Sequence, residues 1–264
     1  MEQGIQHARP SQRVLLTSEP VHLSLVIPAY NEELRLGRTL DAAIAFLARK
    51  PYRSELVLVL DGCTDGTPAL ARRYAGTHGA CEIRVIDNAE NQGKGACVRQ
   101  GMLAAGGSYC FFTDADLSYP LHQIDPFLHA LVTEGGLAIA SRDASAIRYQ
   151  SPLRRLVTFL SRQLMYRLFV PGVKDTQAGF KGFTQAVAQD LFRVQRVSGF
   201  GFDAELLYIA HMRGYRIKPM SVEWEDVPGS KVRLGRDVTR MALDLGRILL
   251  NRLFGRYRKQ NSDQ

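Results

Sequence analysis

The sequence predicts an α/β fold, a mostly parallel sheet with helices on both faces. Two observations support this class. Over the first 140 residues, short apolar runs alternate with stretches of helical periodicity. The composition, 45% hydrophobic and 23% charged over 264 residues, suits a globular domain that buries its core without disulfides. It argues against a disordered or fibrous chain.

Apolar runs rich in β-branched or aromatic residues are predicted as strands buried on both faces. They are residues 22–27, 55–60, 82–86, 109–113 and 137–140. The segments between them are predicted as helices. These helices cover 33–49, a stretch that starts at Thr67-Pro68, 94–105 and 121–132. The repeated strand–helix–strand order indicates parallel strands joined by right-handed crossovers.

We divide the chain into an N-terminal tail, one α/β domain, a basic amphipathic helix and a C-terminal tail. Their ranges are 1–20, 21–235, 236–258 and 259–264. The N-terminus lacks the apolar core of a secretion signal, and we expect the chain to stay in the cytoplasm. No apolar run approaches the length of a spanning helix.

Positive charge is concentrated in the second half of the chain. The formal net charge of the chain is +8. Residues 142–174 carry about +6 and residues 231–259 about +7, so the rest of the chain has a net negative charge. Such asymmetry indicates a polyanionic partner: nucleic acid, lipid head groups or phosphates. Basic residues alternate with leucine in two amphipathic stretches, 152–170 and 236–258. They suit contact with a membrane surface, although packing against the sheet or a dimer partner would give the same pattern.

Polar segments follow four of the predicted strands, and they should meet at one edge of the sheet. The most specific is Asp114-Ala115-Asp116. Two carboxylates one residue apart point to the same side of an extended segment. There they can hold a divalent cation whose remaining positions a substrate diphosphate fills. The tripeptide alone is common in loops, but its place after a buried strand favours the metal.

Two further features point to an anionic nucleotide. Asp61 can accept hydrogen bonds from a base or ribose, or can form a turn or helix cap. The segment 91–95 is predicted to be an anion cradle, with glycines, a helix N-terminus and the charge of Lys94. No GxxxxGK[ST] or GxGxxG motif is present, which argues against ATPase and dehydrogenase functions.

The segments LSLVIPAYNEE, VLDGCTDGT, ENQGKGACVRQGM and FFTDADLSYP, in this order, resemble the inverting family 2 glycosyltransferases of GT-A fold. The later segments DTQAGFKGF and GFGFDAELLYIA resemble the branch that charges polyprenyl phosphates, namely dolichyl-phosphate glucosyltransferases and mannose synthases. The resemblance covers about residues 22–235. It implies a nucleotide-sugar donor (UDP-glucose or GDP-mannose), Mg²⁺ or Mn²⁺, a polyprenyl-phosphate acceptor and no nucleic acid.

The resemblance also implies roles for single residues. The donor-binding positions are Pro28, Tyr30, Glu32, Val59, Asp61, Lys94, Asp114 and Ala115. Asp114 and Asp116 correspond to the metal and diphosphate motif. This sequence departs from the family pattern at two positions. Family members often have two adjacent acids after the second strand, and Leu60 replaces the first of them. Ser118 replaces a glutamine that mannose synthases often use as a metal ligand. The second departure favours glucose over mannose as the transferred hexose.

The acceptor decides whether a base is needed. A phosphate monoester is mostly dianionic at neutral pH and attacks without one, whereas a hydroxyl requires a base. Asp203 matches the acidic residue of the family, and its alternative role is a helix N-cap. We name Asp116, Asp203 and Arg142 as the catalytic residues.

For the acceptor phosphate we name Arg154, Arg155 and Lys231 beside Arg142, each of which could instead be a solvated surface charge. The predicted reaction is inverting transfer of a hexose to a polyprenyl phosphate by an enzyme bound peripherally at the cytoplasmic face of a membrane. The alternative is transfer to a soluble or polysaccharide hydroxyl with Asp203 as the base. A nucleic-acid-binding module is a third hypothesis, but no helix-turn-helix or RNP-like pattern supports it.

Overall fold

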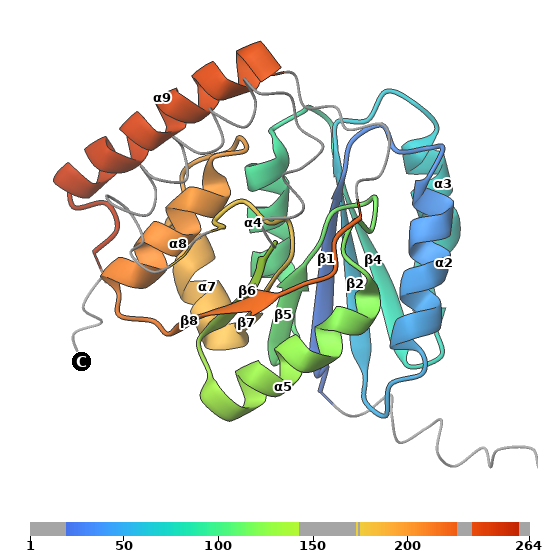
Figure 1. Ribbon diagram of the computed structural model, residues 1–264. Coiled ribbons are helices and arrows are strands. Elements are labelled where there is room, and N and C mark those ends of the chain that lie inside the picture. Colours follow the sequence, from blue (N-terminus) through green and yellow to red (C-terminus); the bar gives the residue numbers. More distant parts are fainter. Residues whose placement is uncertain (1–19, 143–172, 174, 226–233, 259–264) are drawn as a thin grey trace, which may run out of the picture.

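A computed structural model describes residues 20–142, 173, 175–225 and 234–258 (Figure 1). The strands of this part are β1 (Leu23–Ala29), β2 (Ser54–Asp61), β3 (Gly76–His78), β4 (Cys81–Asn88), β5 (Tyr109–Phe112), β6 (Leu137–Ser141), β7 (Lys181–Thr184) and β8 (Ile217–Ser221). The five strands predicted from the sequence are β1, β2, β4, β5 and β6, and each boundary is within two residues of its prediction.

The described strands form one sheet in the order β3-β4-β2-β1-β5-β7-β6-β8. β4, β2, β1 and β5 run parallel to one another, which confirms the predicted parallel centre. β7 is antiparallel to both β5 and β6, and β3 is antiparallel to β4. The carboxyl ends of the four central parallel strands therefore meet at one edge.

The helices of the described part are α2 (Leu36–Leu47), α3 (Thr67–Tyr74), α4 (Lys94–Ala104), α5 (Ile124–Glu134), α7 (Gln185–Val194), α8 (Phe202–Met212) and α9 (Leu234–Leu253), and a 3₁₀ turn covers Leu121–Gln123. α4 agrees with its prediction to one residue. α2 begins three residues later than predicted, at Leu36. α9 begins two residues earlier than predicted, and the chain continues in turns after Leu253 instead of as helix to 258. The amphipathic stretch 152–170 lies outside the described residues.

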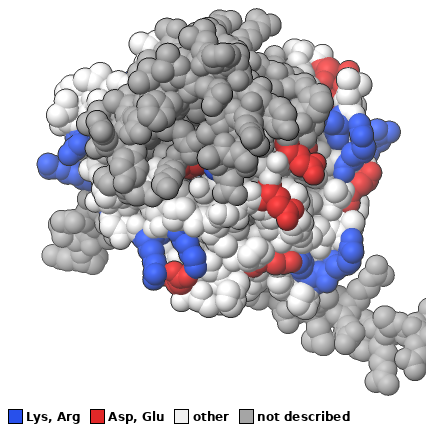
Figure 2. Space-filling model, viewed as in Figure 1, with Lys and Arg blue, Asp and Glu red and all other residues white. Residues whose placement is uncertain are grey.

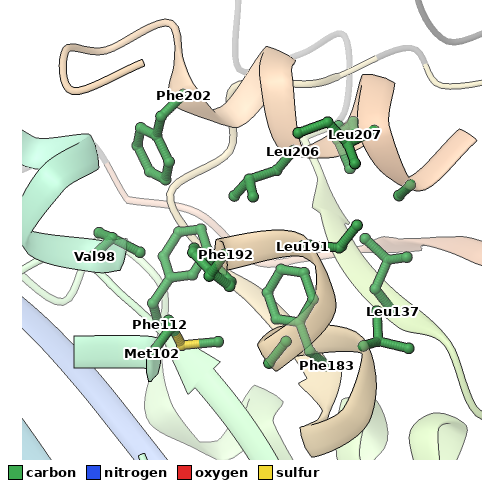
Figure 3. Packing of buried hydrophobic residues seen from close by; sticks show 14 of the residues in the cluster. Val98, Met102, Phe112, Leu137, Phe183, Leu191, Phe192, Phe202, Leu206 and Leu207 are labelled. Carbon is green, nitrogen blue, oxygen red and sulfur yellow. The ribbon is translucent and has the colours of Figure 1, made fainter. Parts of the chain in front are cut away.

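The two faces of the sheet carry separate apolar layers. α2, α3 and α5 contribute to the layer on one face, and α4, α7 and α8 to the layer on the other. In the second layer, aromatic rings of the sheet and helices interlock (Figure 3). The ring of Phe112 on β5 lies 6.1 Å from that of Phe183 on β7 and 5.7 Å from that of Phe202 on α8. This packing fixes the start of α8 over the end of β5.

α9 lies along α8 on the side away from the sheet (Figure 1). Leu245 and Ile248 of α9 are buried in this contact. Among the described helices, none combines the length and the apolar character that crossing a bilayer requires. In the view of Figure 2, the described Lys and Arg side chains lie near the periphery, several of them next to Asp or Glu.

Candidate active site

The two aspartates after β5 sit in a tightly held turn. The hydroxyl of Thr39 donates to the Ala115 carbonyl over 2.6 Å. Asp116 Oδ1 accepts hydrogen bonds from the Ser118 amide (3.0 Å) and hydroxyl (2.8 Å). Leu117 has φ of 51°, an unusual conformation for a leucine that tends to persist only at functional or tightly constrained positions. Ser118 thus orients Asp116.

Asp114 is flanked by a lysine and a glycine. Lys94 Nζ, from the first residue of α4, lies 2.5 Å from Asp114 Oδ1. A Cβ at Gly179 would overlap the Asp114 carboxylate, so any other residue there would displace that carboxylate. Burial alone would lower the pKa of Lys94, but the carboxylates of Asp114 and Asp203 outweigh it and raise that pKa. The ammonium therefore stays charged.

Asp203 is buried in the first turn of α8, where it forms an ion pair. Lys181 Nζ lies 2.5 Å from Asp203 Oδ1 and donates to the Ala178 carbonyl over 2.6 Å. Lys181 is fully buried. Burial raises the pKa of Asp203, against the opposing effects of Lys181 and Lys94. The N-cap of α8 is Gly201, so the interpretation of Asp203 as a helix cap is wrong.

The N-termini of α4 and α8 are held against each other by the backbone. The amides of Gly95 and Ala96 donate to the Ser198 carbonyl over 2.8 and 3.3 Å. A Cβ at Gly95 would lie 2.7 Å from the Cβ of Phe202. This close approach brings Lys94 and Asp203, from segments about 100 residues apart, near enough for their charges to influence each other.

Asp61 organises the loop before α4. Its carboxylate accepts hydrogen bonds from the amides of Gln92 (2.7 Å) and Gly93 (3.1 Å). Because these amides bind Asp61, and those of Gly95 and Ala96 bind Ser198, the predicted backbone cradle for an anion is wrong. The positive charge of Lys94 is the part of the prediction that these hydrogen bonds leave untouched.

The other predicted donor residues differ in accessibility. Tyr30 is exposed at the end of β1, whereas Pro28, Val59 and Ala115 are buried. Glu32 forms an ion pair with Arg35. The hydrogen bond to Glu32 and the charges of Asp116 and Asp114 together raise the pKa of Arg35. Arg35 is thus a cation beside the aspartates that the sequence pattern does not reveal, because one arginine in an amphipathic segment carries no signal.

Arg142 directly follows β6 at the same edge. Its guanidinium Nε and Nη2 donate to the Asp175 carboxylate over 2.8 and 3.1 Å, and it lies 5.6 Å from the centre of the Trp224 ring. Asp175 is buried and was also not predicted, although it opens the segment DTQAGFKGF. Arg154, Arg155 and Lys231 lie outside the described residues.

The donor set suits a divalent cation shared with a substrate. In the described part of the chain, no group of three or more His, Cys, Asp or Glu could hold a metal on its own. Asp114 and Asp116 are hard oxygen ligands at a strand end. Mg²⁺ is commonly bound by one or two carboxylates together with substrate phosphates. The two aspartates fit such a site.

Comparison with known proteins identifies the family of this chain. The profile of glycosyl transferase family 2 matches residues 24–192. A dolichyl-phosphate beta-glucosyltransferase of Drosophila melanogaster is 36% identical over 91% of this chain and 78% of the relative. Dolichyl-phosphate beta-glucosyltransferases of Saccharomyces cerevisiae and Homo sapiens are each 32% identical, over 96% and 91% of this chain and 82% and 78% of the relatives.

Solved structures share the fold. Mannosyl-3-phosphoglycerate synthase from Rubrobacter xylanophilus has a TM-score of 0.66 at 18% identity, covering 96% of this chain and 80% of that one. Glucosyl-3-phosphoglycerate synthase from Mycobacterium tuberculosis, in complex with UDP, has a TM-score of 0.63 at 18% identity, covering 94% and 86%. These structures support the predicted GT-A fold. The profile match and the identity to the curated relatives place this chain in glycosyl transferase family 2.

Proposed function

We propose that this enzyme transfers glucose from a nucleotide sugar, UDP-glucose in preference to GDP-mannose, to a polyprenyl phosphate such as dolichyl phosphate, with inversion. Relatives that cover most of the chain carry the name dolichyl-phosphate beta-glucosyltransferase. The observation that carries the proposal is the ion pair of Asp203 with the buried Lys181.

The ion pair of Asp203 and Lys181 helps to decide whether the acceptor is a phosphate or a hydroxyl. If Asp203 accepted a proton from a hydroxyl nucleophile, the ammonium of Lys181 would lose its counter-charge in the protein interior. An uncompensated buried charge is strongly destabilising. A phosphate nucleophile is already ionised and requires no such proton transfer. The pair therefore favours the phosphate acceptor over the hydroxyl alternative.

The residues at the strand edge have separate roles in this reaction. Asp114 and Asp116 would hold Mg²⁺ or Mn²⁺, which as a Lewis acid stabilises the charge of the departing nucleoside diphosphate. Lys94 adds a positive charge on the same side. Arg142 is held in place by Asp175, and guanidinium groups bind phosphate oxygens well. Arg142 is therefore our candidate for orienting the acceptor phosphate, together with Arg154, Arg155 and Lys231.

We further propose that α9 rests on the membrane that holds the acceptor, at its cytoplasmic face. Large apolar side chains point away from the core along α9 and just beyond it. They are Leu243 (60% exposed), Leu250 (53%), Leu253 (79%) and Phe254 (71%). The spacing of Leu243, Leu250 and Leu253 places these three on one side of the helix. Arg247, Arg252 and Arg256 lie in the same segment, as suits a helix in the interface of an anionic bilayer.

The direct test is a donor panel. Labelled UDP-glucose and GDP-mannose are each incubated with a polyprenyl phosphate and Mg²⁺ or Mn²⁺, and the lipid product is extracted into organic solvent. We expect label from UDP-glucose in the lipid phase, and its loss in Asp116→Ala. Asp125→Asn, an exposed aspartate of α5, is the matched control and should keep full activity. Full activity of Asp116→Ala would overturn the metal assignment.

The alternative hydroxyl acceptor is separated by Asp203→Asn. If the acceptor is a phosphate, this change should reduce turnover far less than Asp116→Ala does. A loss as large as that of Asp116→Ala, with a folded protein, would favour Asp203 as a base.

A further inference from the structure

The aspartate assigned to the metal already has a cation beside it. Lys94 Nζ lies 2.5 Å from Asp114 Oδ1, and the two side chains retain 21% and 30% exposure. At this distance the ammonium occupies one of the positions from which a metal ion would approach the carboxylate. Any role of Lys94 toward that metal rests on the proposed function, since both concern the same ion.

Lys94 also lies within the electrostatic influence of a second carboxylate, that of Asp203. Both Asp114 and Asp203 contribute to raising the pKa of Lys94, and Lys94 in turn acts on the pKa of Asp203. Asp203 has its own counter-ion in Lys181. The direct counter-charge of Asp114 is therefore Lys94, and that of Asp203 is Lys181.

The backbone at Lys94 is fixed, whereas its side chain is long. The next two amides bind the Ser198 carbonyl, and Gly95 packs against Phe202. The ammonium can therefore change partners only by rotation of the side chain, and it stays within reach of the strand edge. A dication added beside an unmoved ammonium would meet strong like-charge repulsion, since unit charges about 4 Å apart interact appreciably even near a protein surface.

We propose that Lys94 is the resident counter-ion of Asp114 in the donor-free enzyme, and that a divalent cation binds Asp114 only by displacing it. The displaced ammonium remains beside Asp203 and becomes available to the diphosphate of the donor. Lys94 is in this sense a positioning residue. It makes the free enzyme a weak metal binder and couples metal binding to nucleotide binding. The coupling arises because the diphosphate gives the displaced ammonium a new anionic partner in place of Asp114.

The test measures metal binding without turnover. Free Mn²⁺ is quantified by electron paramagnetic resonance while the enzyme is titrated, first without and then with UDP. In wild type we expect weak binding that UDP strengthens. In Lys94→Met, the affinity for Mn²⁺ without UDP should rise by at least about tenfold, because a competing charge is gone. The strengthening by UDP should shrink. Lys94→Arg keeps a charge and should stay closer to wild type.

Matched variants keep the result interpretable. Lys218→Met removes an equally long cation paired with Glu134, away from the strand edge, and should leave Mn²⁺ binding unchanged. Lys94→Gln serves as a second neutral variant if Lys94→Met does not fold. An affinity of the neutral variant equal to or below that of wild type would overturn the proposal.

Failure of this inference can be told from failure of the proposed function. Asp114→Asn and Asp116→Asn should each weaken Mn²⁺ binding in the presence of UDP. If they do and Lys94→Met binds no more tightly than wild type, only the counter-ion role is wrong. If neither aspartate variant changes Mn²⁺ binding, the metal site itself is wrong and the proposed function loses its main support.

Discussion

Gly179 shows how one missing side chain shapes the site. The Asp114 carboxylate occupies the space where any other residue at 179 would place its Cβ. We predict that Gly179→Ala lowers turnover by at least about tenfold, because a misplaced catalytic group typically costs one to two orders of magnitude in rate. Glucosyl transfer to polyprenyl phosphate and Mn²⁺ binding in the presence of UDP are the measurements.

Gly246→Ala is the control for this change. A Cβ at Gly246 of α9 would meet no atom within 4 Å, so activity should be retained. Alanine should also stabilise the helix by about 1 kcal/mol relative to glycine. Wild-type turnover of Gly179→Ala would mean that Asp114 is free to move without consequence.

The Lys181–Asp203 pair is the second prediction at this scale. Lys181→Met leaves the buried Asp203 without its closest counter-charge, and we expect it to lower the free energy of unfolding by about 3–5 kcal/mol. The double variant Lys181→Met/Asp203→Leu removes both charges and should regain much of that loss. Urea unfolding of the three proteins measures both effects. A cost below about 1 kcal/mol for Lys181→Met would show that water reaches the pair.

Single residues were predictable from the sequence where local spacing carries the information. Asp114 and Asp116 alternate after a buried strand, and the structure places them in one turn. Asp61 was correctly placed at the strand edge, but its partners are amides 31 and 32 residues away that no local pattern reveals. Lys181 looked like an ordinary lysine, since its burial depends on contacts with a helix that comes later in the chain.

At the scale of elements, strands with a local sequence pattern were predicted, and strands that depend on contacts with distant segments were missed. β1, β2, β5 and β6 are mainly apolar and almost fully buried, as their sequences predict. β4 carries charged residues between its apolar ones and is only partly buried, so the prediction of burial on both faces is wrong for this strand, although its position is right. β7 begins with Lys181-Gly182 and carries one large apolar residue, so it has no strand pattern of its own. It forms because β5 and β6 present edges on both of its sides.

The turn after α9 anchors α8. Glu205 of α8 accepts hydrogen bonds from the amides of Arg196 and Val197 and from the Tyr257 hydroxyl, the last over 2.6 Å. Burial raises the pKa of Glu205 against these stabilising contacts. We predict that Tyr257→Phe lowers the free energy of unfolding by about 1–3 kcal/mol, because a buried carboxylate loses a donor. Urea unfolding is again the measurement.

Tyr74→Phe is the matched control, since the Tyr74 hydroxyl donates to the exposed Asp41. It should change the free energy of unfolding by no more than about 0.5 kcal/mol. Equal effects of the two changes would show that the turn after α9 contributes no more than a surface contact.

At the scale of the whole molecule, α9 has an exposed apolar side and also packs against the loop that leads into the candidate active site. Asp244 of α9 is buried against the loop that starts α8, so close that a Cβ at Gly201 would lie 2.6 Å from the Cβ of Asp244. Asp203 lies two residues after Gly201. Deleting α9 would therefore also remove Asp244, Leu245 and Ile248 from the packing of α8. Loss of membrane binding in a deletion variant could not be separated from loss of folding, and substitutions on the exposed side of α9 are the sharper test.

The final prediction concerns that exposed side. Leu250→Ser and Leu253→Ser together remove large apolar groups that are 53% and 79% exposed, so the fold should persist. Binding to vesicles that contain anionic lipid should fall, because less apolar area enters the interface. The control pair Leu34→Ser and Val132→Ser removes side chains that are 89% and 54% exposed elsewhere on the molecule and should bind as wild type does. Co-sedimentation with vesicles measures both. Turnover should fall with polyprenyl phosphate in vesicles and persist with a short-chain, water-soluble acceptor. Undiminished sedimentation of the α9 variant would place the membrane contact on another surface of the enzyme.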